Sequence, residues 1–190
     1  MAVQILRADD RAPTPWKNGG GLTSEVAVHP RDADTDDFDW RISVADVASA
    51  GPFSAFPGVD RIITLINGPG MVLTVDGAEH RVDAPYEPFP FPGDAVTECE
   101  LLDGPIVDFN VMVRRARMTA EVRVARSATE VRPTAGTDVL AVVLDGSAVL
   151  RQNSVRLGRL DAVLLPEGVG GDFAVEGVLA LVDLVRRSGG

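Results

Sequence analysis

The chain has few of the side chains that most often carry nucleophilic chemistry. Its 190 residues include a single cysteine, Cys99. One cysteine cannot form a disulfide within the chain, so nothing in the sequence indicates an oxidising compartment. Glu98 and Glu100 flank Cys99 and disfavour its thiolate form, which argues against a nucleophilic role.

Metal ligands and nucleotide-binding motifs are equally scarce. The two histidines, His29 and His80, lie far apart in the sequence, and neither belongs to a His-x-His pair. No acidic segment has the spacing of an oxygen-ligand loop. The Gly-x-Ser-x-Gly motif and the glycine-rich nucleotide loops are also missing. We therefore expect no metal, no other cofactor and no assignable catalytic residue.

Long apolar runs and positive charge are lacking as well. No apolar segment approaches the ~20 residues of a membrane helix, and the N-terminus lacks a secretory signal, so we expect a cytoplasmic protein without a membrane partner. Lysine and arginine total 18 against 28 acidic residues, a net charge of −10. This charge repels phosphate backbones, and the short cluster Arg114, Arg115 and Arg117 does not offset it. We expect no nucleic-acid partner.

Short segments of alternating apolar and polar residues lie between the 13 prolines and 19 glycines. None keeps a helical repeat for about ten residues. Many short strands separated by turn residues predict an all-β fold, either a sandwich or a barrel. The predicted strands are residues 23–28, 40–47, 61–66, 71–75, 108–114, 121–125, 139–144 and 179–185.

A weak internal repeat indicates two similar halves. Asn67-Gly68 and Asp145-Gly146 each stand between two apolar segments, which predicts a β-hairpin in each half. Each half then has a proline-glycine corner and ends on an apolar strand with two arginines. Any two hairpins look alike, but the shared order of these features favours a duplication. We therefore predict two β-barrels, residues 1–117 and 118–190.

Three predicted strands have one apolar and one polar face, because alternate side chains of a strand share a face. One interpretation is a sheet whose polar face lies in water. The other is a barrel mouth whose interior holds a small-ligand site. The polar residues are Thr23 and Glu25 on the first strand, Asp39, Arg41 and Ser43 on the second, and Asp108, Asn110 and Arg114 on the third.

Arg41 favours the second interpretation. It lies in the middle of a strand between Trp40 and Ile42. A partly enclosed guanidinium needs a carboxylate partner or an anionic ligand, since leaving it unpaired costs several kcal/mol. Glu25 or Asp39 could be the internal partner, or Arg41 could bind a ligand carboxylate with two charge-assisted bonds. Both arrangements are compatible, with Glu25 orienting Arg41.

Residues 15–21, here called the glycine loop, read Pro-Trp-Lys-Asn-Gly-Gly-Gly. Three consecutive glycines indicate a backbone with positive φ or a close approach by another group. Trp16 is either a wall of the site or a plug on the barrel end. Lys17, Asn18 and Gly19 join the candidate site, because Asn18 and the glycines could offer N–H groups to an anion.

Residues 51–58 are interpreted as structural. Phe53 and Phe56, three positions apart in this proline-bounded loop, are most simply buried anchors for it. Asp60 and Arg61 follow at the start of the next strand. We expect these two residues to form an ion pair of modest energy.

Several motifs follow one another in the first 115 residues. They include Pro15-Trp16-Lys17-Asn18-Gly19-Gly20-Gly21, Phe38-Asp39-Trp40-Arg41-Ile42-Ser43, Gly51-Pro52-Phe53-Ser54 and Asp108-Phe109-Asn110-Val111-Met112. In type and order these motifs resemble the HutD/Ves family, whereas the C-terminal third is similar in pattern only. The resemblance implies a metal-free bicupin, with two cupin-like barrels in one chain. It also implies an association with bacterial histidine utilisation, in which family members bind a pathway metabolite and restrain the pathway. It carries over no catalytic residue, and its Ves branch is described as stress-induced.

Two functions remain open. The first is a protein that binds a small carboxylate metabolite, with Arg41 as its anchor; the resemblance suggests urocanate or N-formylated and formimino glutamates. The second is a metal-free isomerase, epimerase or hydrolase with Glu25 or Asp39 as the base. The sequence is compatible with a homodimer but does not specify one. The candidate ligand-binding residues are Trp16, Lys17, Asn18, Gly19, Glu25, Arg41, Ser43 and Asn110.

Overall fold

The computed structural model describes residues 2–34 and 36–187, and over these residues it confirms the all-β prediction. Within them there is no α-helix, only two single-turn 3-10 helices, η1 (Ala8–Asp10) and η2 (Arg151–Asn153). All eight predicted segments lie within strands. No helix of the described residues is long and apolar enough to cross a membrane.

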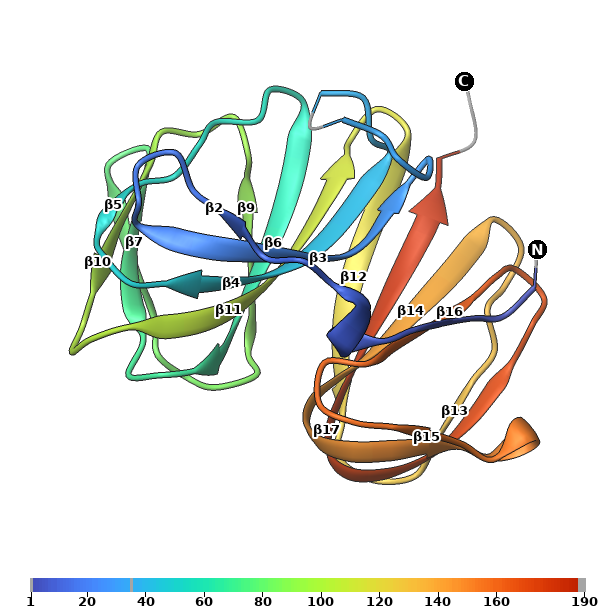
Figure 1. The fold of residues 1–190 in the computed structure, drawn as a ribbon. Coiled ribbons are helices and arrows are strands. Elements are labelled where there is room, and N and C mark those ends of the chain that lie inside the picture. The colour runs from blue at the N-terminus through green and yellow to red at the C-terminus, as the bar shows by residue number, and fades with distance from the viewer. Residues whose placement is uncertain (1, 35, 188–190) are drawn as a thin grey trace. The chain divides into compact units, whose positions relative to one another are not determined.

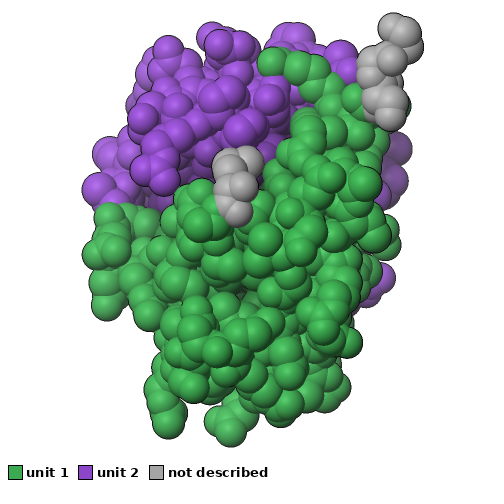
Figure 2. Space-filling model, turned by 90° about the vertical axis from the view of Figure 1, so that its right-hand side faces the viewer, with its two compact units in different colours: residues 1–11, 117–190 green, residues 12–116 purple. Residues whose placement is uncertain are grey.

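The chain divides into two compact units, coloured separately in Figure 2. Residues 12–116 form one, and residues 1–11 together with 117–190 form the other. The first eleven residues thus group with the C-terminal part of the chain rather than with the N-terminal unit. The reason is that β1 (Gln4–Leu6) pairs antiparallel with β16 (Ala162–Leu165). Arg7 Nη1 also donates to Asp161 Oδ2 at 2.7 Å.

Residues 12–116 contain two antiparallel sheets (Figure 1). The larger has the strand order β2-β3-β4-β11-β6-β9 and the smaller the order β5-β10-β7-β8. The larger sheet comprises β2 (Thr14–Pro15), β3 (Gly21–His29), β4 (Trp40–Val47), β11 (Ile106–Arg114), β6 (Val59–Asn67) and β9 (Pro88–Pro92). The smaller comprises β5 (Gly51–Pro52), β10 (Thr97–Leu101), β7 (Met71–Val75) and β8 (Ala78–Val82).

One hydrophobic core joins these two sheets. It includes Ile63 and Leu65 of the larger sheet and Met71, Leu73 and Cys99 of the smaller one, all buried. Alternate residues of each strand enter this core, as the two-residue period of a strand requires. Both sheets are open, so the unit is a cupin-like jelly roll rather than the closed barrel that the sequence suggested.

The other unit is built on a seven-stranded antiparallel sheet. Its main path is β1-β16-β14-β17-β12, while β13 pairs with β17 and β15 with β14. Two long strands, β14 and β17, therefore carry most of the pairing. The remaining bounds are β12 (Met118–Ala125), β13 (Thr129–Val131), β14 (Thr137–Leu150), β15 (Val155–Leu157) and β17 (Gly171–Arg186).

The two hairpins predicted at Asn-Gly and Asp-Gly are wrong. Asn67-Gly68 connects β6 to β7, which belong to different sheets. Asp145-Gly146 lies inside β14, which continues through a register shift while still paired with β17. The tight hairpin is instead β7–β8, where Asp76 and Gly77 both have positive φ, as a type I′ turn needs.

Candidate functional site

A cavity of about 910 Å³ opens in the unit formed by residues 12–116. One wall is the inner face of the larger sheet, from β3, β4, β6 and β11. The rim comes from residues 15–18 of the glycine loop and from residues 52–57. A volume of this size suits a small-molecule ligand.

The structure brings six of the eight candidate residues together around this cavity. Glu25 and Gly19 do not line it: Glu25 reaches Arg41 from β3, and Gly19 shapes the glycine loop. The six that line it are Trp16, Lys17, Asn18, Arg41, Ser43 and Asn110.

Strand register explains why residues far apart in sequence meet here. Ser43 of β4 lies opposite Asn110 of β11. Met112, two positions further along β11, lies opposite both Arg41 of β4 and Arg61 of β6. Residues two apart on a strand point to the same face, so all of these side chains share the cavity wall.

Arg61 is the most enclosed cation of the site, with only 8% of its surface exposed. Its guanidinium carbon lies 5.2 Å, 5.6 Å and 4.9 Å from the ring centres of Phe53, Phe56 and Phe91. Asn110 Oδ1 accepts long hydrogen bonds from Nη2 and Nε at 3.3 Å and 3.4 Å. Desolvated cation–π contacts contribute up to about 2 kcal/mol each, so this aromatic cage offsets part of the cost of burial.

No carboxylate oxygen of the described residues forms an ion pair with Arg61. Burial lowers the pKa of Arg61 to about 10, while the negative charge of Asp108 opposes this shift. The guanidinium is therefore protonated at neutral pH. Its remaining donors are available to an anion in the cavity.

Asp108 is the second buried charge of the cavity, with 3% exposed. Burial raises the pKa of Asp108 to about 7; Asp46 adds to the increase, and Arg61 counteracts it. Arg61 forms no ion pair with Asp108, although both residues line the same cavity and the charge of Arg61 acts on the Asp108 carboxyl group.

Arg41 is partly enclosed, as the sequence suggested, with 22% of its side chain exposed. Its Nε donates to Glu25 Oε2 at 2.8 Å, so Glu25 is the internal partner considered above. Asp39 is not among the residues that line the cavity, and its Oδ2 lies 3.9 Å from His29 Nε2. Arg41 reaches the cavity as an already paired cation.

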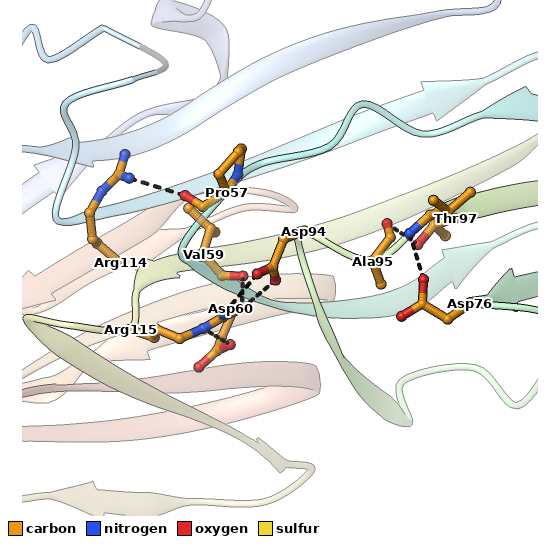
Figure 3. Close-up of polar contacts among 10 residues, drawn as sticks. Pro57, Val59, Asp60, Asp76, Asp94, Ala95, Thr97, Arg114 and Arg115 are labelled. Carbon is orange, nitrogen blue, oxygen red and sulfur yellow. Dashed lines mark hydrogen bonds and ion pairs between the residues drawn. The ribbon is translucent and has the colours of Figure 1, made fainter.

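The predicted Asp60–Arg61 ion pair is wrong, because neighbouring residues of a strand point to opposite faces. Asp60 accepts instead from Arg115 Nε at 2.8 Å, and Asp94 accepts from Arg115 Nη2 at 2.6 Å (Figure 3). The same alternation could have revealed the role of Arg61. It shares its face with Ile63 and Leu65, which marks it as an inward-pointing arginine.

The paired arginines at the end of β11, Arg114 and Arg115, hold the loops around the cavity. Arg114 donates to the carbonyl oxygens of Pro57 at 3.3 Å and Asp36 at 2.7 Å (Figure 3 shows the first). Arg115 donates to the carbonyl of Val59 at 2.8 Å. Since Phe53 and Phe56 lie in the loop before Val59, these bonds fix the aromatic cage that sequence reasoning had taken as purely structural.

The glycine loop shows both features that its sequence predicted. Gly19 has φ of +73°, and Gly21 packs so closely that a Cβ there would lie 2.5 Å from the backbone oxygen of Asp46. Trp16 is half-buried, packs against the core and donates from Nε1 to Thr23 Oγ1 at 2.7 Å. It therefore serves as a wall of the cavity and as part of the core.

The structure also bears on metal binding and on the reactivity of the single cysteine. Across the described residues, no three His, Cys, Asp or Glu side chains gather as a metal-ligand set. Burial, with Asp108 and Glu100, raises the pKa of Cys99 to about 12, so this thiol stays protonated. Its sulfur lies 3.7 Å from the sulfur of Met71 in the core.

The sequence profile of HutD matches residues 8–182. The chain belongs to the HutD family. An uncharacterized 21.2 kDa protein from the hutC 3' region of Pseudomonas putida is 37% identical over 196 residues, covering 97% of this chain and 98% of that protein. Membership associates the chain with histidine utilisation.

A solved structure and a shorter match support the same family. HutD from Pseudomonas fluorescens SBW25, solved in a formate condition, has 36% identity and a TM-score of 0.86, covering 98% of this chain and 100% of its own. Protein Ves from Cronobacter sakazakii is 42% identical over 111 residues, covering 58% of this chain and 60% of Ves. The predicted HutD/Ves resemblance is confirmed.

The packing of the glycine loop can be tested by a matched pair of variants. We expect Gly21→Ala to lower the free energy of unfolding by about 2–3 kcal/mol, because its methyl group would collide with the Asp46 carbonyl. Gly19→Ala has open space and should cost only about 1 kcal/mol for its positive φ. Urea denaturation measures both. A larger loss for Gly19→Ala would contradict this loop geometry.

The burial of Asp108 predicts a pH-dependent stability. Its folded pKa of about 7 exceeds that of an unfolded aspartate, so wild type should lose stability as pH rises toward 7 and level off above it. Asp108→Asn removes this term and should gain about 3 kcal/mol relative to wild type between pH 5 and pH 8. Denaturation at both pH values measures the gain. The exposed control Asp103→Asn should show none, and an equal gain in both variants would contradict the assignment.

Proposed function

We propose that the cavity binds a small carboxylate-bearing metabolite, with Arg61 as its anchor. One observation carries this proposal: a buried guanidinium faces a cavity and has no ion-pair partner among the described residues. Burying an uncompensated charge costs several kcal/mol. A ligand carboxylate would supply the missing negative charge through two parallel hydrogen bonds, which suit the planar fork of arginine.

The surroundings of Arg61 favour anion binding over simple structural use. Phe53 and Phe56 lie over the guanidinium, which keeps water from one of its sides. Low local polarity strengthens a charge-assisted bond relative to the same bond in water. Asn110 and Ser43, paired across β11 and β4, add neutral polar groups to the same wall. Together they form one charged anchor with weaker hydrogen-bonding groups around it.

The proposed biological role is modulation of histidine utilisation by a bound pathway metabolite. Family membership supports the association with that pathway. Urocanate, N-formylglutamate and formiminoglutamate carry the carboxylate that Arg61 would recognise. Formate is the smallest test ligand of this class, and the Pseudomonas fluorescens relative was solved in a formate condition.

The enzyme alternative has less support from the geometry. Glu25 is engaged by Arg41 and does not line the cavity. Asp39 does not line it either. Neither candidate base therefore faces a ligand held at Arg61, so we prefer a binding protein.

The proposal predicts which arginine matters more for binding. Arg61→Met keeps an unbranched side chain within the aromatic cage but removes the charge. A charge-assisted hydrogen bond contributes about 1.5–3 kcal/mol, so this variant should bind at least about tenfold more weakly in calorimetric titration. Arg41→Ala should lose less, because Arg41 is already paired with Glu25.

Thermal unfolding of both variants provides the control for folding. Formate, urocanate, N-formylglutamate and formiminoglutamate are titrated into wild type in parallel. A folded Arg61→Met that binds as tightly as wild type would remove Arg61 as the anchor. If none of the four ligands binds wild type at millimolar concentration, the binding function itself is wrong.

A further inference from the structure

The second charge of the cavity, Asp108, poses a problem for anion binding. It lies on the inner face of β11, two residues before Asn110, and lines the same cavity as Arg61. A ligand carboxylate bound to Arg61 would place a second negative charge near a buried aspartate. Like charges in a site of low polarity cannot both remain ionised without a large cost.

Few other groups act on Asp108. Arg61 on β6 is the cation that favours its ionised form. Asp46 on β4 opposes ionisation, and the Cys99 thiol on β10 interacts with the same carboxyl group. Arg41 lies further along the inner face and is neutralised by Glu25. Lys17 and Arg114 also line the cavity, but neither is buried. Arg61 is therefore the buried cation that has to balance both Asp108 and the ligand, and it cannot neutralise both at once.

We propose that this cavity takes up its carboxylate ligand together with one proton, which Asp108 holds. The inference rests on the proposed function, because it requires an anion at Arg61. In the free protein Arg61 stabilises the Asp108 carboxylate from a distance. When the ligand occupies Arg61, that stabilisation is lost and Asp108 becomes a neutral acid.

Neutral Asp108 changes which ligands fit. A protonated carboxyl group has an O–H donor, whereas an ionised one only accepts hydrogen bonds. The cavity would therefore combine an anion-binding arginine with a neutral hydrogen-bond donor on the same wall. Its ligand class is a carboxylate with a neutral acceptor oxygen, such as a carbonyl, beside the charged group. A ligand with a second negative charge near Asp108 would be rejected.

The sign of the pH effect follows from the pKa of Asp108. Below about pH 7 the free protein already holds the proton, so affinity should not depend on pH. Above about pH 7 the proton has to be taken from solution, so the dissociation constant should rise toward tenfold per pH unit. Formate stays ionised throughout, so the dependence comes from the protein.

The test is calorimetric titration of the full chain with formate between pH 5.5 and 8.5, in pairs of buffers with different ionisation enthalpies. Buffer dependence of the heat measures protons taken up on binding. We expect almost none at pH 5.5 and close to one at pH 8. Wild-type binding without proton uptake at pH 8, or with an affinity independent of pH, would overturn the proposal while leaving anion binding at Arg61 intact.

Two variants assign the proton to its residue. Asp108→Asn has nearly the same shape and stays neutral, so it should bind formate equally at pH 6 and 8.5 without proton uptake. Asp46→Asn removes a neighbouring charge but keeps Asp108, and it should retain the loss of affinity above pH 7. A folded Asp108→Asn that still takes up a proton would overturn the assignment. If Asp108→Asn does not fold, the wild-type proton count still decides whether uptake occurs.

If formate, urocanate, N-formylglutamate and formiminoglutamate all fail to bind wild type at every pH, the proposed function and this inference both fail. If a ligand does bind wild type, the Arg61→Met variant tests the proposed function separately from the proton uptake by Asp108. Its loss of binding at every pH would support the anchor whether or not Asp108 takes up a proton.

Discussion

The buried guanidinium of Arg61 is the constraint on which the rest of the site depends. An arginine in this position would cost several kcal/mol without compensation. Three phenylalanine rings, the Asn110 side chain and the more distant charge of Asp108 supply that compensation. The loop with Phe53 and Phe56 is held by a hydrogen bond from Arg114 to the carbonyl of Pro57, so strand β11 also supports the cavity. These interactions offset the charge without neutralising it.

Arg61 and Asp108 line the same cavity but form no salt bridge with each other. Direct contact between Arg61 and Asp108 would form a buried salt bridge, the simplest way to satisfy both. Anion binding at Arg61 and protonation of Asp108 are the two consequences that we propose for this arrangement.

Strand alternation made the fold and the polar wall predictable, whereas turn and burial details were not. The segments containing Arg41, Ser43 and Asn110 were assigned correctly, because two-residue periodicity needs only local sequence. The Asp145-Gly146 hairpin failed because a turn signal can also lie inside a bulged strand, where pairing with β17 overrides it. The burial of Arg61 was not predicted, because Arg61 follows Asp60 and the two residues were expected to form an ion pair. Its burial depends on Phe53 and Phe91, which approach it only in the folded chain.

The central claim is that Arg61 is the carboxylate anchor of this cavity. The most direct measurement is the anomalous diffraction of crystals soaked in bromoacetate, whose bromine marks the position of a bound carboxylate. The account predicts one bromine peak inside the cavity, with the carboxylate on the Arg61 guanidinium in density. A peak at Arg41 or elsewhere, with the cavity at Arg61 free of ligand, would contradict it.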